Sequence, residues 1–199
     1  MITLSKKRSA GVASQQETMD EDVRWIRAAR TDIEQFATLY ERYFQGVYQY
    51  CLRRVKVQEE AEDLTSQVFI QALTHLQDYR GGTVAAWLFQ IAHNMVISYF
   101  RRNRLNISLE ANDTELLSDA VDPLDSLIQG ETQDILRTLV ATLPDVQQEL
   151  LALKISGRLT SREIAEMYGK NPNTVRVTLY RMIDHLRKQY QQIVGELTK

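Results

Sequence analysis

The sequence is poor in the residues that interrupt helices. Its 199 residues include only 8 glycines and 3 prolines, and these two residue types supply most of the tight turns between strands. Hydrophobic residues make up 44% of the chain, which is enough to bury a core at this length. The composition therefore predicts an all-α protein of one or two domains and argues against hairpins and sheets.

Cysteine and histidine are also scarce, with one and three residues respectively. Cys51 lies among apolar residues without a second cysteine or a histidine near it, so we expect it to pack in the core. His75, His93 and His185 are far apart in the sequence and show no metal-ligand spacing. The sequence predicts no metal site, no cofactor and no catalytic residue, and it fits the reducing cytoplasm.

Signals for export or membrane insertion are missing as well. Basic residues near the start are not followed by an apolar stretch. Residues 81–100 carry no formal charge and could cross a bilayer by length, but Gln90, Asn94 and Ser98 interrupt them at helical spacing. We expect a soluble helix there, no membrane insertion, a cytoplasmic location and a disordered segment over residues 1–20.

The charge pattern divides the chain. The net charge is -2, unlike the strongly basic surface of a protein that holds duplex DNA unaided, so DNA binding needs local patches or a partner. Residues 106–131 carry seven acids and no lysine or arginine, which predicts an extended linker between domains at 21–105 and 132–199. Its charge either keeps the chain open and soluble or occupies a positively charged channel built for nucleic acid.

The first domain has three expected helices. Apolar residues recur at steps of three and four from Ile33 to Val55, which predicts one long helix. The next helix, residues 59–76, directs Leu64 and Val68 inward and begins with a cluster of acids. These acids either favour the helix dipole or form a contact surface for a basic or polar partner. A glycine pair then predicts an exposed loop over residues 77–83.

The third helix, residues 84–104, combines a core face with a basic end. We expect Trp87, Leu88, Ile91, Met95 and Ile97 to point largely into the core. The opposite face carries Gln90, Asn94, Ser98, Arg101, Arg102 and Arg104, with Tyr99 and Phe100 beside it. Aromatic rings stack on unpaired bases and arginines bind phosphates, so this mixture suits single-stranded or opening DNA. On the residues alone, a solvated basic helix end above core aromatics is the favoured interpretation, because cations at a helix C-terminus are also favoured by the dipole.

Residues 161–181 have the pattern of a helix-turn-helix. Ala165 is small where two helices cross closely, and Gly169 can take the positive φ of a tight turn. Asn171 is placed to cap the second helix, whose first residue is Pro172. Two apolar residues face the shared core, Ile164 and Val175. The pattern predicts a DNA-reading domain.

Four stretches in this order resemble the extracytoplasmic-function (ECF) group of bacterial RNA polymerase sigma factors. They are AEDLTSQVFIQAL from Ala61, YRGG followed by WLFQIAHNMVISYFRR from Trp87, LPDVQQELLAL from Leu143, and SREIAEMYG...NTVRVTLYR from Ser161. The resemblance covers roughly residues 33–190 except the linker. It implies two small helical domains, similar to sigma regions 2 and 4, joined by an acidic flexible linker. It also implies a sigma factor rather than an enzyme.

The resemblance further implies partners and site residues. Core RNA polymerase would bind through the clamp helices of its largest subunit and the flap of its second largest, and the linker would thread the RNA-exit path. The residues facing polymerase would be Asp63, Leu64, Gln67 and Val68. Those at the minus-ten element of promoter DNA would be Tyr79, Arg80, Gly81, Gly82, Asn94, Ser98, Arg101 and Arg102. Those at the minus-thirty-five element would be Asn173, Thr174, Arg176, Val177, Tyr180 and Arg181. An anti-sigma factor wedged between the two domains is the expected regulator.

The sequence departs from the family at five positions. An acidic residue is usual at Gln67 and an aspartate at Ser98. Val177 and Thr178 replace a common serine-arginine pair, and Lys170 replaces an apolar residue. The changes in the second helix remove one contact to phosphate or base and offer an apolar one, suited to a thymine methyl. The promoter sequence therefore cannot be copied from relatives.

Two other functions compete with this one. A sigma-like decoy would bind an anti-sigma factor without reading DNA, which the acidic balance allows. Arg101, Arg102, Arg176 and Arg181 argue against a decoy, which has no need of them. A helical hydrolase is the third candidate, but Asp63 has no plausible base partner.

Overall fold

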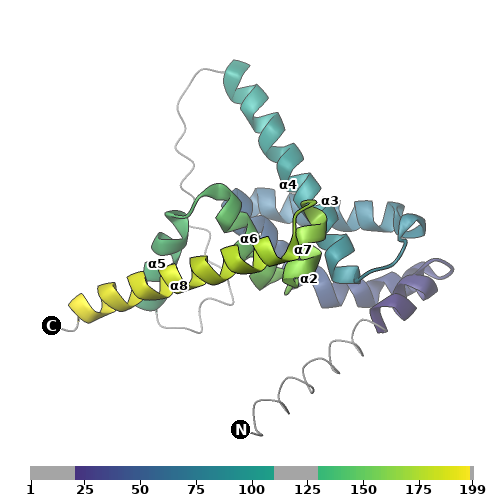
Figure 1. Ribbon diagram of the computed structural model, residues 1–199. Helices are drawn as coiled ribbons and strands as arrows, with labels where there is room; N and C mark the ends of the chain where they lie inside the picture. Colours follow the sequence, from purple (N-terminus) through teal and green to yellow (C-terminus); the bar gives the residue numbers. More distant parts are fainter. Residues whose placement is uncertain (1–20, 110–129, 198–199) are drawn as a thin grey trace, which may run out of the picture.

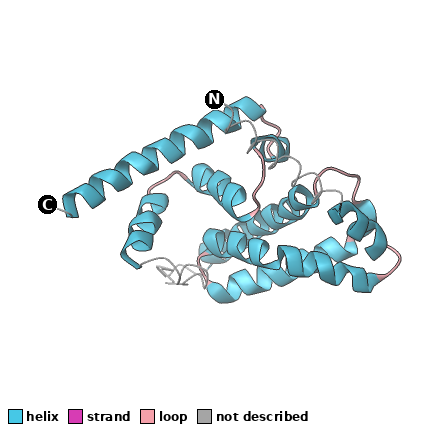
Figure 2. Cartoon of the chain, turned by 90° about the horizontal axis from the view of Figure 1, so that it is seen from below, coloured by secondary structure: helices cyan, strands magenta, loops and turns pink. Residues whose placement is uncertain are grey.

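The computed structural model describes residues 21–109 and 130–197. These residues form helices and no strand, which confirms the all-α prediction (Figures 1 and 2). No helix within them is long and apolar enough to cross a membrane. The expected disorder of residues 1–20 and the expected extended chain of residues 110–129 lie outside the described residues. Residues 106–109, which we expected in the linker, are helical.

The first domain begins with a helix over residues 21–29. It continues with η1 (Ile33–Gln35), α2 (Phe36–Val55), α3 (Gln58–Thr74), η2 (Leu76–Asp78) and α4 (Val84–Leu109). The expected long helix from Ile33 is wrong at its start, because the Asp32 side chain accepts a hydrogen bond from the Glu34 amide and caps a separate 3-10 turn. Cys51 is fully buried in the core, as predicted, and burial raises the pKa of its thiol to about 12.

After Val84, the buried positions of α4 form two adjacent rows: Leu88, Ala92, Val96 and Tyr99 in one, and Phe89 and His93 in the other. The expectation that Ile97 points into the core is wrong, because Ile97 continues the second row but lines an open groove instead of a packed contact. Ile97 is 51% exposed. Tyr99 is buried as a core residue and Phe100 is half-buried, whereas Arg101, Arg102 and Arg104 are exposed.

The second domain contains α5 (Gly130–Ala141), α6 (Asp145–Ser156), α7 (Ser161–Met167) and α8 (Pro172–Leu197). A capping box starts α7: the Thr160 hydroxyl accepts from the Glu163 amide, and the Glu163 carboxylate accepts from the Thr160 amide. Gly169 has a φ of +59°, as its turn requires. The Asn171 side chain caps α8 by accepting from the Asn173 amide at 2.8 Å. Ile164, Ala165 and Val175 are buried between α7 and α8, so the helix-turn-helix prediction is confirmed in its details.

The two domains pack against each other and share one hydrophobic core, which runs from α2, α3 and α4 into α6, α7 and α8. Two glycines mark the closest approach between the domains. A Cβ at Gly46 would lie 2.8 Å from the Ser156 carbonyl oxygen, and a Cβ at Gly157 would lie 3.1 Å from the Phe89 ring. The sequence analysis did not anticipate this closed arrangement.

A second, smaller core lies at the other end of the first domain. Its buried members come from the helix over residues 21–29, from α2 and from the chain around η2; they are Ile26, Ala29, Leu39, Leu76, Tyr79 and Val84. Because Tyr79 belongs to this core, the core supports the buried side of the loop over residues 79–83.

Replacing Gly46 by alanine tests the packing of the domains. The new methyl group would force α2 and α6 apart, so we expect a larger radius of gyration in small-angle scattering and a lower midpoint of thermal unfolding. Gly195→Ala is the matched control, because nothing lies within 4 Å of its Cβ and alanine is favoured over glycine in helices by about 1 kcal/mol. A G46A variant as compact and stable as the wild type would contradict the closed arrangement.

Candidate nucleic-acid interface

The first turns of α8 present one continuous exposed surface, which we call the recognition face. All of its predicted members are exposed: Asn173, Thr174, Arg176, Val177, Tyr180 and Arg181. Val175, Leu179 and Met182 lie on the opposite side of the helix and are buried. The 3.6-residue period of α8 thus separates a packing side from a polar, basic and aromatic side that can enter a major groove.

Hydrogen bonds within α8 set which side chains reach outward. Arg176 donates to the Asn173 side-chain oxygen at 2.6 Å, which holds the guanidinium over the first turn of the helix. The Thr178 hydroxyl donates to the Thr174 carbonyl at 2.9 Å, so it is turned back onto its own helix. Of the two residues that replace the family's serine-arginine pair, Val177 is therefore the one that faces solvent.

The loop over residues 79–83 requires its glycines. Gly81 and Gly82 have φ values of +117° and +87°, which favour glycine strongly, and both are exposed together with Arg80. Tyr79 differs from the expectation of an exposed loop residue. It is 8% exposed, packs edge-on against Trp87 at 5.5 Å and donates its hydroxyl to the Gly82 carbonyl at 2.7 Å. Its side chain anchors the loop instead of projecting from it.

Beyond the loop, α4 carries the remaining residues assigned to the minus-ten element. Asn94 is exposed and accepts a hydrogen bond from Gln90 at 3.1 Å, whereas Ser98 is half-buried. Arg101 and Arg102 are exposed near the C-terminal end of the helix. The loop and α4 therefore each carry exposed basic and polar residues, although the aromatic side chains expected beside them belong mainly to the core.

The residues expected to face polymerase divide into two groups. Leu64 and Val68 are almost completely buried, so their side chains cannot contact a partner. Asp63 is exposed and Gln67 is half-buried on the outer side of α3. Continuing from Asp63 at helical spacing leads to Ile70, which is 60% exposed and to which the sequence analysis assigned no role.

Tyr40 extends this outer surface onto α2. It is 41% exposed, and its ring lies 4.7 Å from that of Phe69 and 5.1 Å from that of Phe44. Supported rings of this kind offer apolar contact area at low conformational cost, as residues of protein interfaces do.

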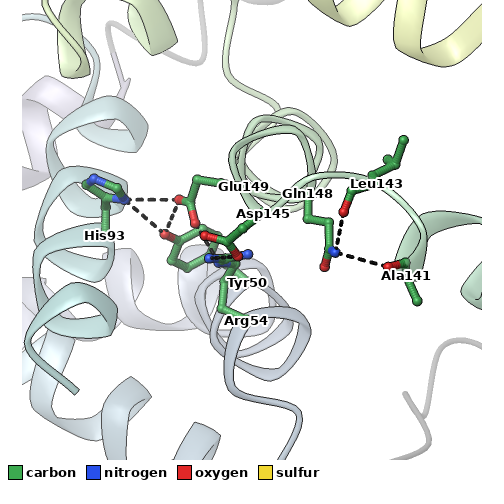
Figure 3. A network of polar contacts seen from close by, with 8 residues as sticks. All are labelled: Tyr50, Arg54, His93, Ala141, Leu143, Asp145, Gln148 and Glu149. Carbon is green, nitrogen blue, oxygen red and sulfur yellow. Dashed lines mark hydrogen bonds and ion pairs between the residues drawn. The ribbon is translucent and has the colours of Figure 1, made fainter. Parts of the chain in front are cut away.

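A buried polar cluster, which we call the interdomain network, joins the two domains (Figure 3). Glu149 of α6 lies at its centre: its carboxylate is 2.5 Å from Arg54 Nε and 3.0 Å from His93 Nδ1, and it accepts from the Tyr50 hydroxyl at 2.5 Å. Arg54 also donates to Asp145 at 2.8 Å. Tyr50 and Arg54 come from α2 and His93 from α4, so every one of these contacts crosses the domain boundary.

The buried carboxylate of the interdomain network is compensated by its neighbours. Burial disfavours the charged form of Glu149, but the hydrogen bond from His93 and the charge of Arg54 outweigh it and lower the pKa of the carboxyl. Burial raises the pKa of the Tyr50 hydroxyl well above its usual value, and Glu149 adds to this effect. Glu149 is therefore an anion and Tyr50 a neutral donor. The sequence analysis missed this cluster, although an acid directly before the apolar run at 150–153 was a visible signal.

Two further hydrogen bonds cross the boundary at its edges. Arg53 donates to the Ser156 hydroxyl at 2.8 Å, and the Thr83 hydroxyl donates to the Glu163 carboxylate. The Thr83 contact links the start of α4 to the first helix of the helix-turn-helix. In this arrangement the recognition face and the exposed surface of the loop and α4 both remain open to solvent.

Beside the interdomain network, α4 and α6 enclose an open groove of about 750 Å³. Its outer walls combine the exposed side chains of Ile97 and Val146 and the half-buried ring of Phe100 with two arginines, Arg101 and Arg104. No group of histidine, cysteine or acidic side chains among the described residues is arranged to hold a metal ion. The surfaces of this chain are suited to binding anionic and apolar partners.

Comparisons with known proteins agree with this geometry. The Sigma-70 region 2 family model matches residues 39–105, and the Sigma-70, region 4 model matches residues 133–186. The chain is 32% identical to the RNA polymerase sigma factor YlaC of Bacillus subtilis, over 75% of this chain and 88% of YlaC. It is also 32% identical to the ECF RNA polymerase sigma factor BldN of Streptomyces coelicolor, over 81% of this chain but only 62% of BldN.

The chain belongs to the ECF group of RNA polymerase sigma factors. Sigma factors are non-enzymatic initiation factors, so the family excludes the hydrolase considered above. Two solved structures show the same fold. The first is RpoE of Bartonella quintana in complex with the anti-sigma factor NepR, with a TM-score of 0.60 and 15% identity over 81% of this chain and 98% of RpoE. The second is CnrH in complex with the cytosolic domain of CnrY, with a TM-score of 0.59 and 18% identity over 88% of this chain and 97% of CnrH.

Replacing Glu149 by glutamine tests the interdomain network of this sigma factor. The variant keeps the shape of the side chain but removes its charge, and Arg54 retains only Asp145 as an ionic partner. We expect the closed arrangement to lose about 3 kcal/mol, the lower end for breaking a buried ion pair. Energy transfer between dyes on α3 and α8 would report the lost compactness.

Glu166→Gln is the control, because Glu166 pairs with Arg162 at 2.9 Å on the protein surface, where such pairs contribute little. Equal energy transfer in the two variants would show that Glu149 does not hold the domains together.

Proposed function

We propose that this protein binds core RNA polymerase in the cytoplasm, recognises the minus-thirty-five and minus-ten promoter elements, and initiates transcription. The observation that carries the proposal is the recognition face of α8, which is exposed, basic and held on a capped helix-turn-helix. A second exposed surface on the loop and α4 supports it. Each domain thus offers its own surface for nucleic acid.

The recognition face is suited to duplex DNA. Arg176 lies in the second turn of α8, where recognition helices contact base edges, and its planar guanidinium can bind a guanine in two places. Val177 adds an apolar contact that suits a thymine methyl. Tyr180 and Arg181 follow one turn later and would meet the sugar-phosphate backbone.

The surface of the loop and α4 is suited to opened DNA. Arg80 and the two exposed glycines let a nucleotide approach the backbone closely, and Asn94 can hydrogen-bond a base edge. Arg101 and Arg102 would bind the phosphates. The Tyr79 hydroxyl fixes the loop by donating to the Gly82 carbonyl. In this proposal Tyr79 therefore supports the loop that receives the base.

Core polymerase would dock on the outer side of α3 and α2. Asp63 and Gln67 supply the polar part of this surface, and Ile70 and Tyr40 supply the apolar part. Leu64 and Val68 hold α3 in place from the core. The clamp helices of the largest subunit are the expected partner of this surface, and the flap of the second largest subunit is the expected partner of the second domain.

Binding of both promoter elements requires the two domains to separate. The elements are about 25 base pairs apart, which at 3.4 Å per base pair is roughly 85 Å of duplex. In the closed arrangement α7 packs on α4, and even the 26-residue helices α4 and α8 are each only about 39 Å long. We therefore propose that polymerase binds an open form in which the interdomain network is broken.

An anti-sigma factor is the proposed regulator. The similar RpoE structure contains the anti-sigma factor NepR. In this chain the groove between α4 and α6 offers Ile97 and Val146 as exposed apolar contacts beside Arg101 and Arg104. A partner helix with an apolar face and acidic flanks would fit it and would compete with opened DNA for Arg101.

Run-off transcription with core polymerase across a genomic promoter library tests the proposed function. We expect specific initiation from a small set of promoters, and poor binding of promoter DNA by the protein alone, because its net charge is slightly negative. Strong unaided binding, or no transcription from any promoter, would contradict the proposal. Silence in this assay together with tight binding of an anti-sigma factor would instead indicate a decoy.

Arg176→Ala tests the upstream contact. If Arg176 contacts a base, its loss should weaken recognition of the upstream element by about 1 to 3 kcal/mol and leave the affinity for core polymerase unchanged. Arg137→Ala is the matched control: it also removes an exposed arginine that bonds a side chain three residues earlier, here Asp134 at 3.1 Å, but from α5. Equal promoter affinity in the two variants would contradict the assignment.

A further inference from the structure

The helix over residues 21–29 lies outside both matched family regions, yet it packs directly beneath the loop over residues 79–83. Ile26 and Ala29 are buried in the smaller core with Leu76 and Tyr79. Nothing lies within 4 Å of a Cβ built on Gly81 or Gly82, and the side chains that hold the loop belong to Tyr79 and Thr83 at its two ends. Its conformation therefore depends on how its ends are held.

Arg30, the residue that follows this helix, holds the start of the loop. Its Nε donates to the Leu76 carbonyl at 3.2 Å and its Nη2 donates to the Tyr79 carbonyl at 2.7 Å. The two carbonyls flank η2, so one guanidinium joins the beginning of this turn to the first residue of the loop. A planar fork of donors is suited to binding two acceptors at once, and a lysine does not reproduce its geometry.

The opposite end of the same helix is fixed to α2. Asp22 is buried, accepts from Arg42 at 2.6 Å and accepts from the Tyr43 hydroxyl. The Arg42 guanidinium lies over the Trp25 ring at 4.6 Å. With Asp22 anchored to α2 at one end and Arg30 bound to the loop at the other, the helix forms a rigid support between the first-domain core and the loop.

We propose that Arg30 is a positioning residue for minus-ten recognition. It acts through the Leu76 and Tyr79 carbonyls to hold Arg80 and the glycine pair in the conformation that receives an unpaired base. This assignment rests on the proposed function, and it extends the minus-ten site to a part of the chain that the sequence analysis did not connect with DNA.

The test compares duplex and pre-melted templates. Full-length Arg30→Gln, Arg30→Lys and Arg24→Gln variants are assayed with core polymerase on a promoter identified in the library experiment, either as duplex or with an unpaired bubble across its minus-ten element. Arg24 is exposed on the same helix and controls for the loss of one charge. Affinity for core polymerase and the thermal unfolding midpoint are measured for each protein.

We expect R30Q to reduce initiation from duplex by about tenfold, the effect of losing one or two hydrogen bonds from a charged group. The bubble template should restore most of this loss, and core affinity should not change. R30K should resemble R30Q on duplex because it keeps the charge but not the fork. R24Q should match the wild type on both templates.

Three results would overturn the Arg30 assignment alone: R30Q initiating from duplex as well as R24Q, R30K matching the wild type, or an R30Q loss that is equally large on the bubble and accompanied by weaker core binding. The last result would mark a general structural role. A wild-type chain that initiates from neither template would overturn the proposed function and this assignment together.

Discussion

The closed arrangement depends on the ion pair between Glu149 and Arg54. Each domain contributes one charge, and both charges are buried where the domains meet. The cost of removing two ions from water offsets much of their attraction, so a buried pair gives little net stability. It does penalise any packing that leaves either charge unpaired. When the domains separate, water hydrates both ions again, so neither is left buried and unpaired. The contact therefore favours one packing of the domains and can still be reversed.

This reversibility matters because the closed form leaves both DNA surfaces uncovered. The recognition face of α8 and the surface of the loop and α4 are exposed while the domains are packed. Under the proposed function, the closed form lacks the distance between them that promoter DNA requires. The domain contact would then restrain the protein by holding the two surfaces too close together, and a partner in the groove between α4 and α6 would act on the same distance.

Local structure followed from the sequence to a large extent. The glycine turn, the Asn171 cap and the buried Cys51 each depend on a few neighbouring residues, and all were predictable. Contacts between distant segments were not. Periodicity identifies the apolar side of a helix but not the segment that covers this side. The exposure of Ile97 and the anchoring role of Tyr79 were therefore not predictable from periodicity. The Tyr50–Glu149 contact joins residues 99 positions apart.

The two carboxylate oxygens of Glu163 accept hydrogen bonds from different domains. One accepts from the Thr160 amide and hydroxyl and so completes the cap of α7, while the other accepts from Thr83 of the first domain. Separation of the domains releases only the second oxygen, which water can satisfy, and the cap stays intact. The helix-turn-helix therefore leaves the first domain already folded. In the proposed opening its release would be a rigid-body movement on the time scale of domain motion, with no helix to rebuild before it meets DNA.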